Sequence, residues 1–342
     1  MKYQLPRLAM LFATALIFIP LSASAETAIV VNVDNFDRAQ TDFEFSGIVK
    51  LADGINKVHS NREPTPIDKQ NVIRMNRDTL YSLGVINISK GATVTLPETG
   101  KRYMSLMIIN NDGYVNEVFY GRGSYELTME KFDTPYVGVV IRTLANPEDK
   151  ADLAIAHKLQ DQVKITTGSD DPFVLPNYDK ASYESTLNAI LELAKGLKRY
   201  TQTFGSKAEV NPVHFMIGTA SAWGGLPDKA AQYINVQPDL PVGKYELTVK
   251  DVPVKGFWSI SLYNEKGYFQ QNDLHAYSLN NLTAKPNSDG SYTIRFGGCT
   301  KSTENCLPIM KGWNYAVRMY EPSKAIIDGT WKFPGPPQPR NH

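Results

Sequence analysis

Short runs in which apolar and polar residues alternate recur along the chain. Residues 77–85 form the clearest run, and residues 103–110, 124–128 and 136–144 are similar and are bounded by Gly, Pro or Asp. The pattern returns after residue 244, in four runs over residues 244–250, 257–263, 291–296 and 315–320. The hydrophobic pattern therefore predicts two groups of β-strands separated by a stretch of different character.

Helical spacing of apolar residues appears before the first group of strands and between the two groups. Phe36, Ala39, Phe43, Gly47, Leu51 and Ile55 recur every three or four residues, with Asp34 or Asn35 as the expected cap. The segment 146–149 (Asn-Pro-Glu-Asp) predicts a helix capped by Asn146 and running to about Val163. Another helix is expected around residues 183–197, ending before Gly205.

The two groups of strands resemble each other in sequence. Residues 103–115 (YMSLMIINNDGYV) align without a gap with residues 257–269 (FWSISLYNEKGYF). Downstream, residues 124–127 correspond to 291–294, and Arg142 before Pro147 corresponds to Arg318 before Pro322. This order indicates a duplicated unit: a hairpin that turns at Asn-x-x-Gly-Tyr, two further strands, then a helix. Hairpins that converged independently on the same turn residues are the alternative.

Duplicated strands with alternating patterns must cover their apolar faces, which antiparallel sheets do as sandwiches or jelly-roll-like barrels. We therefore expect a mainly β protein with accessory helices (α+β), in which two related antiparallel domains have helices between them. The expected boundaries are a signal peptide over residues 1–25, an N-terminal β-rich domain over 26–178, a helical connector over 179–225 and a C-terminal β-sandwich domain over 226–342. A cleft between the domains is a common place for a ligand.

The first residues have the features of a secretory signal peptide. Lys2 and Arg7 precede an apolar run over residues 8–19, and Ala23-Ser24-Ala25 forms a small-residue cleavage site. Cleavage removes two of the 36 basic residues and none of the 35 acidic ones, which leaves a nearly neutral chain. That charge gives no electrostatic reason to expect nucleic acid or an anionic membrane as a partner. We expect a periplasmic or secreted protein with no stable membrane insertion after cleavage.

The chain has two cysteines, Cys299 and Cys306. In the oxidising compartment of an exported protein, such a pair favours a disulfide over a metal or catalytic site, although two free thiols remain the alternative.

Several motifs resemble a known pair of bacterial families. Residues 76–82 (NRDTLYS) are similar to the signature of the domain-of-unknown-function family 1254, and residues 102–105, Asn110 and residues 120–121 to its continuation. Residues 252–259 (VPVKGFWS), 289–291, 318–320 and 328–331 resemble the domain-of-unknown-function family 1214. The resemblance implies two β-rich domains in this order and supplies no reaction. The chain departs from the second family at Cys306, where the family usually has Trp between Asn305 and Leu307, so any ligand contact by that Trp is in doubt here.

The best polar cluster is Asn76, Arg77, Asp78, Thr79 and Tyr81. On a strand Arg77, Thr79 and Tyr81 would share one face, and Asn76 and Asp78 the other. Adjacent Arg and Asp can anchor a carboxylate or a sugar. Asp78 is a weak candidate for a catalytic base. A structural network at a β corner, with Arg77 paired to a distant carboxylate, is the competing interpretation.

Other candidates come from the repeat and from aromatic residues. Arg142 and Arg318 are expected to form a shared structural ion pair at equivalent positions, with ligand binding as the alternative. Tyr114, Trp258, Tyr263, Tyr268 and Trp331 could stack on a ligand, or could belong to ordinary sandwich cores. None of the five histidines has the spacing of a helical metal site, and no nucleotide-binding or nucleophile-elbow motif is present, so we expect no metal and no cofactor.

These observations favour an exported envelope protein that binds a small polar or glycan ligand between its domains. A hydrolase of the esterase or glycosidase type, using Asp78 or another carboxylate, is the first alternative. An envelope interaction module without a small ligand is the second.

Overall fold

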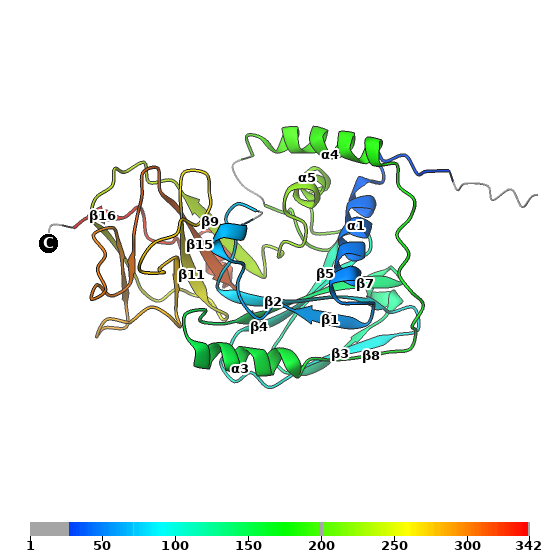
Figure 1. Cartoon of the computed structure of the whole chain (residues 1–342), viewed down its shortest axis with the longest axis horizontal. Helices are drawn as coiled ribbons and strands as arrows, with labels where there is room; N and C mark the ends of the chain where they lie inside the picture. Colours follow the sequence, from blue (N-terminus) through cyan, green and yellow to red (C-terminus); the bar gives the residue numbers. More distant parts are fainter. Residues whose placement is uncertain (1–26, 71, 198–200, 341–342) are drawn as a thin grey trace, which may run out of the picture.

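The computed structural model describes residues 27–70, 72–197 and 201–340. The expected signal peptide, residues 1–25, lies outside the described residues. Two β-rich regions follow each other along the chain and lie side by side, with helices between and around them (Figure 1). The predicted fold class, α+β with antiparallel sheets in two regions, is confirmed.

The first region is a sandwich of two antiparallel sheets. Its larger sheet has the order β1-β2-β7-β4-β5 and its smaller sheet the order β6-β3-β8. The strands are β1 (Lys57–Ser60), β2 (Thr79–Asn87), β3 (Ala92–Leu96), β4 (Met104–Asn110), β5 (Val115–Tyr120), β6 (Gly123–Leu127), β7 (Tyr136–Leu144) and β8 (Lys164–Thr167). Apolar side chains such as Val94, Leu106 and Val139 fill the space between the two sheets.

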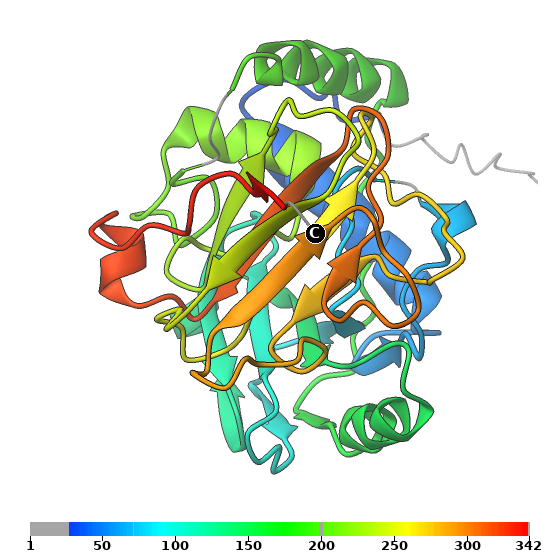
Figure 2. The ribbon, with the colours of Figure 1, turned by 90° about the vertical axis from the view of Figure 1, so that its left-hand side faces the viewer.

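The second region repeats this arrangement. Its sheets have the orders β12-β11-β15-β9 and β14-β13-β10-β16. The strands are β9 (Ala231–Val236), β10 (Tyr245–Val249), β11 (Trp258–Tyr263), β12 (Ser278–Asn280), β13 (Tyr292–Phe296), β14 (Cys306–Leu307), β15 (Asn314–Tyr320) and β16 (Gln338–Pro339). All pairs are antiparallel except β13–β14. Figure 2 views these strands face-on, with the first region behind them.

The described helices are α1 (Phe36–Leu51), α2 (Met129–Phe132), α3 (Lys150–Asp161), α4 (Lys180–Ala194), α5 (Pro212–Ala222), α6 (Lys324–Ile327) and the 3₁₀ helix η1 (Ile67–Lys69). Most of the helices lie around the first region, whereas α6 and the 3₁₀ helix η1 pack against apolar clusters of the second region. Helices α1, α4 and α5 pack on one another through a small apolar cluster that includes Phe36, Ile190 and Ile217. Both α4 and α5 fall within the span expected for a helical connector, whose boundaries stay a prediction.

Strand for strand, the two regions share one topology. The order β2-β7-β4-β5 matches β9-β15-β11-β12, and β6-β3-β8 matches β13-β10-β16, with every matched strand in the same chain order and direction. Only β1 and β14 have no counterpart among the described strands. The strand pairing therefore supports the duplication that the sequence predicted.

Individual hydrogen bonds repeat as well. Asn110 Oδ1 accepts from the amides of Asp112 and Tyr114 at 3.1 and 3.0 Å, and Asn264 Oδ1 accepts from those of Lys266 and Tyr268 at 3.0 and 3.1 Å. The glycines of the two turns, Gly113 and Gly267, have φ of 88° and 83°, a conformation that favours glycine. The Asn-x-x-Gly-Tyr turn is thus one structure built twice.

Each region also has a segment that packs against the other region. The segment before β2 crosses to the second region, where the amide of Arg74 donates to the Gly267 carbonyl at 2.7 Å. The segment before β9 crosses to the first region, where the Gly224 carbonyl accepts from Arg142 Nη2 at 3.0 Å. We call these two segments, residues 72–78 and 223–230, the exchanged arms.

The observed helices correct two sequence expectations. The helix predicted from Asn146 begins at Lys150 and is capped by Asp149, whose carboxylate accepts from the amides of Ala151 and Asp152. The Asn146 side chain instead accepts from the Glu148 amide in the turn that precedes the helix. The first helix ends at Leu51, and Asp53 and Gly54 beyond it take positive φ values of 54° and 124°, which do not continue a helix.

The predicted disulfide between Cys299 and Cys306 is confirmed. It closes the connection between β13 and β14, with the two cysteines seven positions apart. Disulfides of this kind persist in oxidising compartments.

Removing this disulfide should destabilise the second region. In the chain-entropy account, a loop this short contributes about 2.5 kcal/mol. We expect Cys299→Ser/Cys306→Ser to lower the free energy of unfolding by about 2–3 kcal/mol in urea titrations under non-reducing conditions. Adding reductant should shift the wild type by a similar amount and leave the double variant unchanged; an equal reductant response in both would contradict the assignment.

Candidate functional site

A row of polar side chains crosses the larger sheet of the first region. In register across β2, β7, β4 and β5 lie Tyr81, Arg142, Ser105 and Tyr120. Residues paired in this way across neighbouring strands point to the same face of the sheet. We call these four residues the first row.

The second region carries an equivalent row. Across β9, β15, β11 and β12 the paired residues are Tyr233, Arg318, Ser259 and Asn280. Tyr, Arg and Ser therefore recur in the same three positions, and only Tyr120 and Asn280 differ. We call these residues the second row.

Aromatic side chains join the two rows. Tyr103, two residues before Ser105, packs on its own repeat equivalent, Phe257, with ring centroids 5.1 Å apart. It also contacts Tyr320, two residues after Arg318, at 5.5 Å. Contact between equivalent residues is what an approximate twofold relation between the two regions produces. The junction of the regions thus brings together motif residues from both halves of the chain.

The predicted cluster at Asn76 lies at this junction. Asn76 Nδ2 is 3.0 Å from Thr79 Oγ1, 3.2 Å from the Tyr81 hydroxyl and 3.3 Å from the Tyr320 hydroxyl. Thr79 and Tyr81 therefore share a face, as the sequence pattern predicted. Arg77 does not join them, because β2 begins only at Thr79.

Tyr81 has an unusual electrostatic environment. Burial alone would raise the pKa of its hydroxyl, but the Arg142 guanidinium and the hydrogen bonds with Asn76 and Thr79 outweigh burial and lower that pKa. The Arg142 guanidinium lies over the Tyr81 ring, 5.3 Å from its centroid. Burial raises the pKa of the neighbouring Tyr103 hydroxyl instead. Tyr81 is thus the more acidic of these two phenols.

Arg77 and Asp78 lie beside the row and join elements of the structure. Arg77 Nη1 donates to the Thr65 carbonyl at 2.7 Å, and its guanidinium lies over Tyr277 and 4.0 Å from Glu148. Asp78 is only 1% exposed, and its Oδ1 accepts from Asn280 Nδ2 of the second row at 3.0 Å. Its Oδ2 is buried and has no hydrogen-bond partner in the described structure.

The two equivalent arginines differ in how their donors are used. Arg318 donates to Ser261 Oγ at 2.8 Å, to the Arg74 and Met75 carbonyls at 2.6 and 3.3 Å, and to the Tyr263 hydroxyl at 2.7 Å. Arg142 donates to one carbonyl, that of Gly224, has a weak contact of 3.8 Å with the Met107 sulfur, and interacts with the Tyr81 hydroxyl, whose pKa it lowers.

The ion pairs expected for these arginines are not found within the described residues. Neither guanidinium has a described carboxylate within 4.0 Å. At Arg318 the reason is that main-chain oxygens of an exchanged arm and hydroxyl oxygens of β11 occupy the positions where a carboxylate would lie, whereas at Arg142 the arm supplies one carbonyl, that of Gly224.

The first row is partly accessible and has polar groups without partners. Tyr81 and Tyr120 are half-buried, and Tyr233 of the second row is 47% exposed although it pairs with a central strand. The hydroxyls of Tyr103 and Ser105 are buried and near enough to influence each other, but neither meets the geometry of a hydrogen bond with any group of the described structure. Such groups are rare in proteins and call for an explanation.

The aromatic residues proposed as a stacking platform are not brought together. Tyr114 stacks on Phe215 of α5, with ring centroids 4.4 Å apart. Trp258 is buried in the core of the second sandwich, and Trp331 packs against the edge of the same core. The tyrosines that do converge, Tyr103, Tyr120, Tyr233 and Tyr320, were not singled out from the sequence. Extending the repeat upstream to match Tyr81 with Tyr233 would have found one of them.

Two surface hollows lie away from the row. One, of about 340 Å³, is lined by residues of β3, β6 and β8 that include Thr93 and Thr166. The other, of about 420 Å³, is lined by Phe119, Tyr125 and Lys131 among others. The first lies on the smaller sheet of the first region and the second between β5, β6 and α2, and neither is lined by a residue of the two rows.

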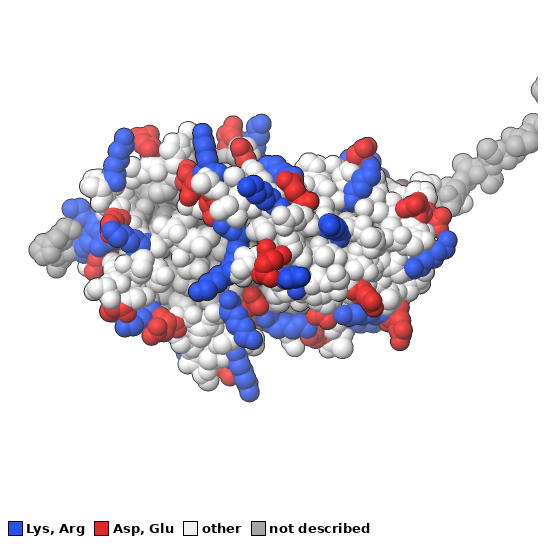
Figure 3. Space-filling model, turned by 90° about the horizontal axis from the view of Figure 1, so that it is seen from below, with Lys and Arg blue, Asp and Glu red and all other residues white. Residues whose placement is uncertain are grey.

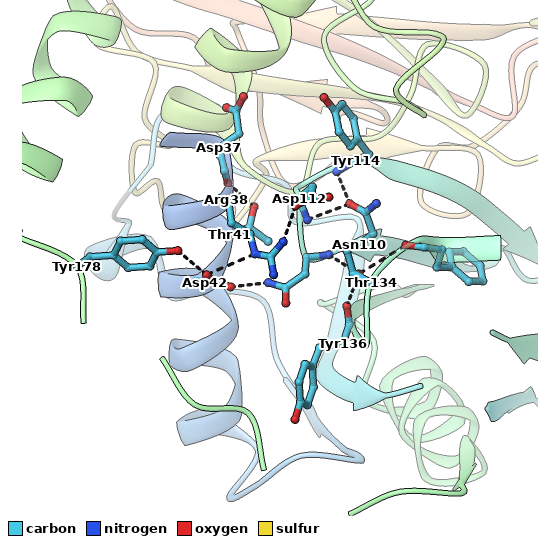
Figure 4. A network of polar contacts seen from close by, with 12 residues as sticks. Asp37, Arg38, Thr41, Asp42, Asn110, Asp112, Tyr114, Thr134, Tyr136 and Tyr178 are labelled. Carbon is cyan, nitrogen blue, oxygen red and sulfur yellow. Dashed lines mark hydrogen bonds and ion pairs between the residues drawn. The ribbon is translucent and has the colours of Figure 1, made fainter. Parts of the chain in front are cut away.

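A second polar network connects α1 to the turn after β4 (Figure 4). Asp42, which is 2% exposed, accepts hydrogen bonds from Asn111 and from the Tyr178 hydroxyl, and Arg38 links it to Asp112. Burial raises the pKa of Asp42, and these partners only partly oppose it. One turn earlier, burial raises the pKa of Asp37 to about 6, against a hydrogen bond with Thr219 that lowers it. The network holds α1, α5 and the turn together.

The raised pKa of Asp37 predicts a pH dependence of stability. The folded state favours the protonated carboxyl, so its stabilising effect is complete below pH 4 and is lost as the pH rises through about 6. We expect Asp37→Asn to unfold at the same urea concentration as the wild type at pH 4, and to be more stable by on the order of 2 kcal/mol at pH 8. Asp34→Asn, which removes an exposed charge of the same segment, is the control. A constant difference between Asp37→Asn and wild type across this range would contradict the prediction.

Structural comparison places the fold among solved proteins. The crystal structure of the VPA0106 protein from Vibrio parahaemolyticus is similar with a TM-score of 0.65 at 18% sequence identity, over 89% of this chain and 98% of that one. A putative uncharacterized protein from Burkholderia cenocepacia has a TM-score of 0.47 at 14% identity, over 85% of this chain and 84% of that one. At this identity the Vibrio structure supports the shared fold alone. The comparison with curated proteins gives no match.

The sequence matches two families of proteins of unknown function, one in each β-rich region. Residues 55–167 match DUF1254 and include β1 to β8, Asn76 and the first row. Residues 234–324 match DUF1214 and include Arg318, Ser259 and Asn280. The chain therefore belongs to the proteins that join a DUF1254 domain to a DUF1214 domain, in the order that its motifs predicted.

Proposed function

We propose that the protein is an exported binding protein that holds a small polar or glycan ligand against the first row, at the junction of its two β-rich regions. The observation that carries the proposal is the set of polar groups there with unused hydrogen-bonding capacity. Arg142, Tyr103 and Ser105 have few partners or none, and Tyr81, Tyr120 and Tyr233 keep accessible surface beside them. A few convergent polar groups among aromatic side chains are typical of small-molecule sites.

Compartment and charge agree with this proposal. The disulfide favours an oxidising compartment, and the chain begins with a signal-like segment. No described helix is long and apolar enough to cross a membrane. On the face seen in Figure 3, acidic and basic side chains are interspersed and form no large area of one sign. That face therefore offers no large patch of one sign to a charged partner.

The hydrolase alternative depends on Asp78. Its carboxylate is almost fully buried and is bonded to Asn280, so a substrate could reach it only after the junction opened. We favour a role for Asp78 in joining the two regions. Activity in esterase or glycosidase panels that is lost in Asp78→Asn, while folding is retained, would restore the alternative.

A thermal-shift panel tests the binding proposal. The purified mature protein is screened against neutral sugars, sugar acids, small carboxylates and amino acids. A ligand at 100 times its dissociation constant should stabilise the folded state by about 2.7 kcal/mol. We expect Tyr81→Phe, which removes one hydroxyl from the row, to weaken binding of the hit at least fivefold.

Tyr292→Phe is the matched control, because Tyr292 packs against Trp258 in the second sandwich and lies away from the row. The control should bind the hit as the wild type does. Flat responses across the whole panel, or equal binding by wild type and Tyr81→Phe, would reject the site; the interaction module without a small ligand would then be the better interpretation.

A further inference from the structure

The two rows offer an internal comparison, because the chain contains the same arginine twice in the same strand register. Arg142 pairs with Ser105 and Tyr81, and Arg318 pairs with Ser259 and Tyr233. Both arginines are buried, with 6% and 4% of their surface exposed. A guanidinium has five N–H donors and does not lose its proton in a protein, so each of them must find oxygen acceptors or counter-charge.

In the second row the chain supplies those acceptors itself. Four oxygens surround Arg318, two of them main-chain carbonyls of adjacent residues in the exchanged arm, Arg74 and Met75. Asp78 of the same arm lies beyond 4.0 Å but still adds negative potential at Arg318. The second row thus shows which partners suit a guanidinium at this position: two neighbouring oxygens that accept its hydrogen bonds, with a negative charge close by.

In the first row each of these partners is missing or weaker at the equivalent position. Met107 stands where the second row has Ser261, and Ile109 stands where it has Tyr263. The arm residue equivalent to Asp78 is Ala230. Their main-chain carbonyls make matching hydrogen bonds: that of Asp78 accepts from the Ala145 amide at 3.0 Å, and that of Ala230 accepts from the Glu321 amide at 2.9 Å. One carbonyl, that of Gly224, remains where Arg318 has two.

We propose that Arg142 binds the carboxylate of a small organic acid through the donors that the Gly224 carbonyl does not use, at positions that main-chain and hydroxyl oxygens hold around Arg318 in the second row. A carboxylate supplies two adjacent acceptors and the missing negative charge, and it matches the planar fork of a guanidinium. The unpartnered hydroxyls of Tyr103 and Ser105 lie beside Arg142 and can donate to the same group. Tyr81, Tyr120 and Tyr233 then contact the rest of the acid. This inference rests on the proposed binding function and names the class of ligand.

Matched pairs of probes test the ligand class. The mature protein is titrated by calorimetry with D-galacturonate and D-galactose, and with benzoate and benzyl alcohol. Within each pair only the carboxylate differs appreciably. We expect the acid of at least one pair to bind at least tenfold more tightly than its neutral partner, and Arg142→Met to abolish that difference.

Met107→Ser provides a variant that keeps Arg142 and every charge. It gives the first row the hydroxyl that Ser261 gives the second, so the guanidinium gains an internal partner, and we expect the acid to bind several-fold more weakly. Ile260→Val, a conservative change in the core of the second sandwich, is the control and should leave the affinity unchanged. If Arg142→Met does not fold, Met107→Ser still decides the matter.

The possible outcomes distinguish a failure of the carboxylate inference from a failure of the binding function. Equal binding of acid and neutral partner, lost in Tyr81→Phe, would overturn the carboxylate inference and leave the binding function standing. Acid binding that survives Arg142→Met, or that Met107→Ser does not weaken, would also overturn it. No binding of any probe, together with a flat thermal-shift panel, would reject the binding function itself.

Discussion

Arg318→Met is expected to lower the free energy of unfolding by about 3–5 kcal/mol, whereas Arg142→Met lowers it by only about 1–2 kcal/mol. Removing Arg318 takes a donor from four buried or half-buried oxygens; the Met75 carbonyl and the Tyr263 hydroxyl still bond to each other, but the Arg74 carbonyl and Ser261 lose their donor, and each orphaned group costs about 1–3 kcal/mol before the structure relaxes. Removing Arg142 orphans one carbonyl and relieves a buried cation that has few partners. Urea unfolding of both variants, with equal slopes, measures the difference.

The difference between these two losses of stability tests whether Arg318 has stronger partners within the protein than Arg142. The substitutions are chemically identical and lie at equivalent strand positions, so side-chain size and strand context are closely matched. Equal losses of stability in the two variants would mean that Arg142 has partners of the same strength as those of Arg318. Adding a saturating acid ligand should stabilise the wild type and Arg318→Met but leave Arg142→Met unchanged.

Asp78→Ala is expected to destabilise the protein by about 2–4 kcal/mol. The substitution leaves the buried Nδ2 of Asn280 without its acceptor and removes the negative charge nearest to Arg318 along the arm. Asp78→Asn keeps an oxygen acceptor for Asn280, and we expect it to cost only about 1 kcal/mol. The midpoint of urea unfolding for the two variants gives the comparison.

A double-variant cycle sharpens this prediction. Because Asp78 and Asn280 bond across the two regions, the effects of Asp78→Ala and Asn280→Ala should not add, and the double variant should be about as stable as the worse single variant. Additive losses would show that the bond between the regions contributes little and that Asp78 acts elsewhere.

Much of the fold could be predicted from sequence because its signals are local. Strand β7 coincides with the predicted run over residues 136–144, and α1 begins where the helical stripe begins. The turn motif could be recognised in both halves of the sequence, because its geometry needs an Asn acceptor and a glycine with positive φ at a fixed spacing. The helix that starts at Lys150 was misplaced by one turn, because both Asn146 and Asp149 are good caps and only the surrounding structure selects one.

The site was harder to predict because its residues meet only through pairing between distant strands. Tyr81 lies opposite Arg142, and Tyr233 lies opposite Arg318, but no spacing along the chain marks either pair. Strand β9, which carries Tyr233, was not predicted at all. The sequence could not show that the arginines lack the expected ion pairs. Main-chain carbonyls take the place of a carboxylate, and every residue has a main-chain carbonyl, so no residue type marks these partners.

The exchanged arms have a consequence for how the chain can be divided. Suppose the chain is cut so that each exchanged arm stays with the strand that follows it. Arg142 of the first region would then lose the Gly224 carbonyl, and Arg318 of the second region would lose the Arg74 carbonyl, because each carbonyl belongs to the other fragment. Two fragments made apart would therefore each expose an unfinished surface, and the same fragments made together should associate as subunits do. The duplicated chain thus resembles two subunits joined by a covalent linker, and we expect the two regions to fold as one cooperative unit.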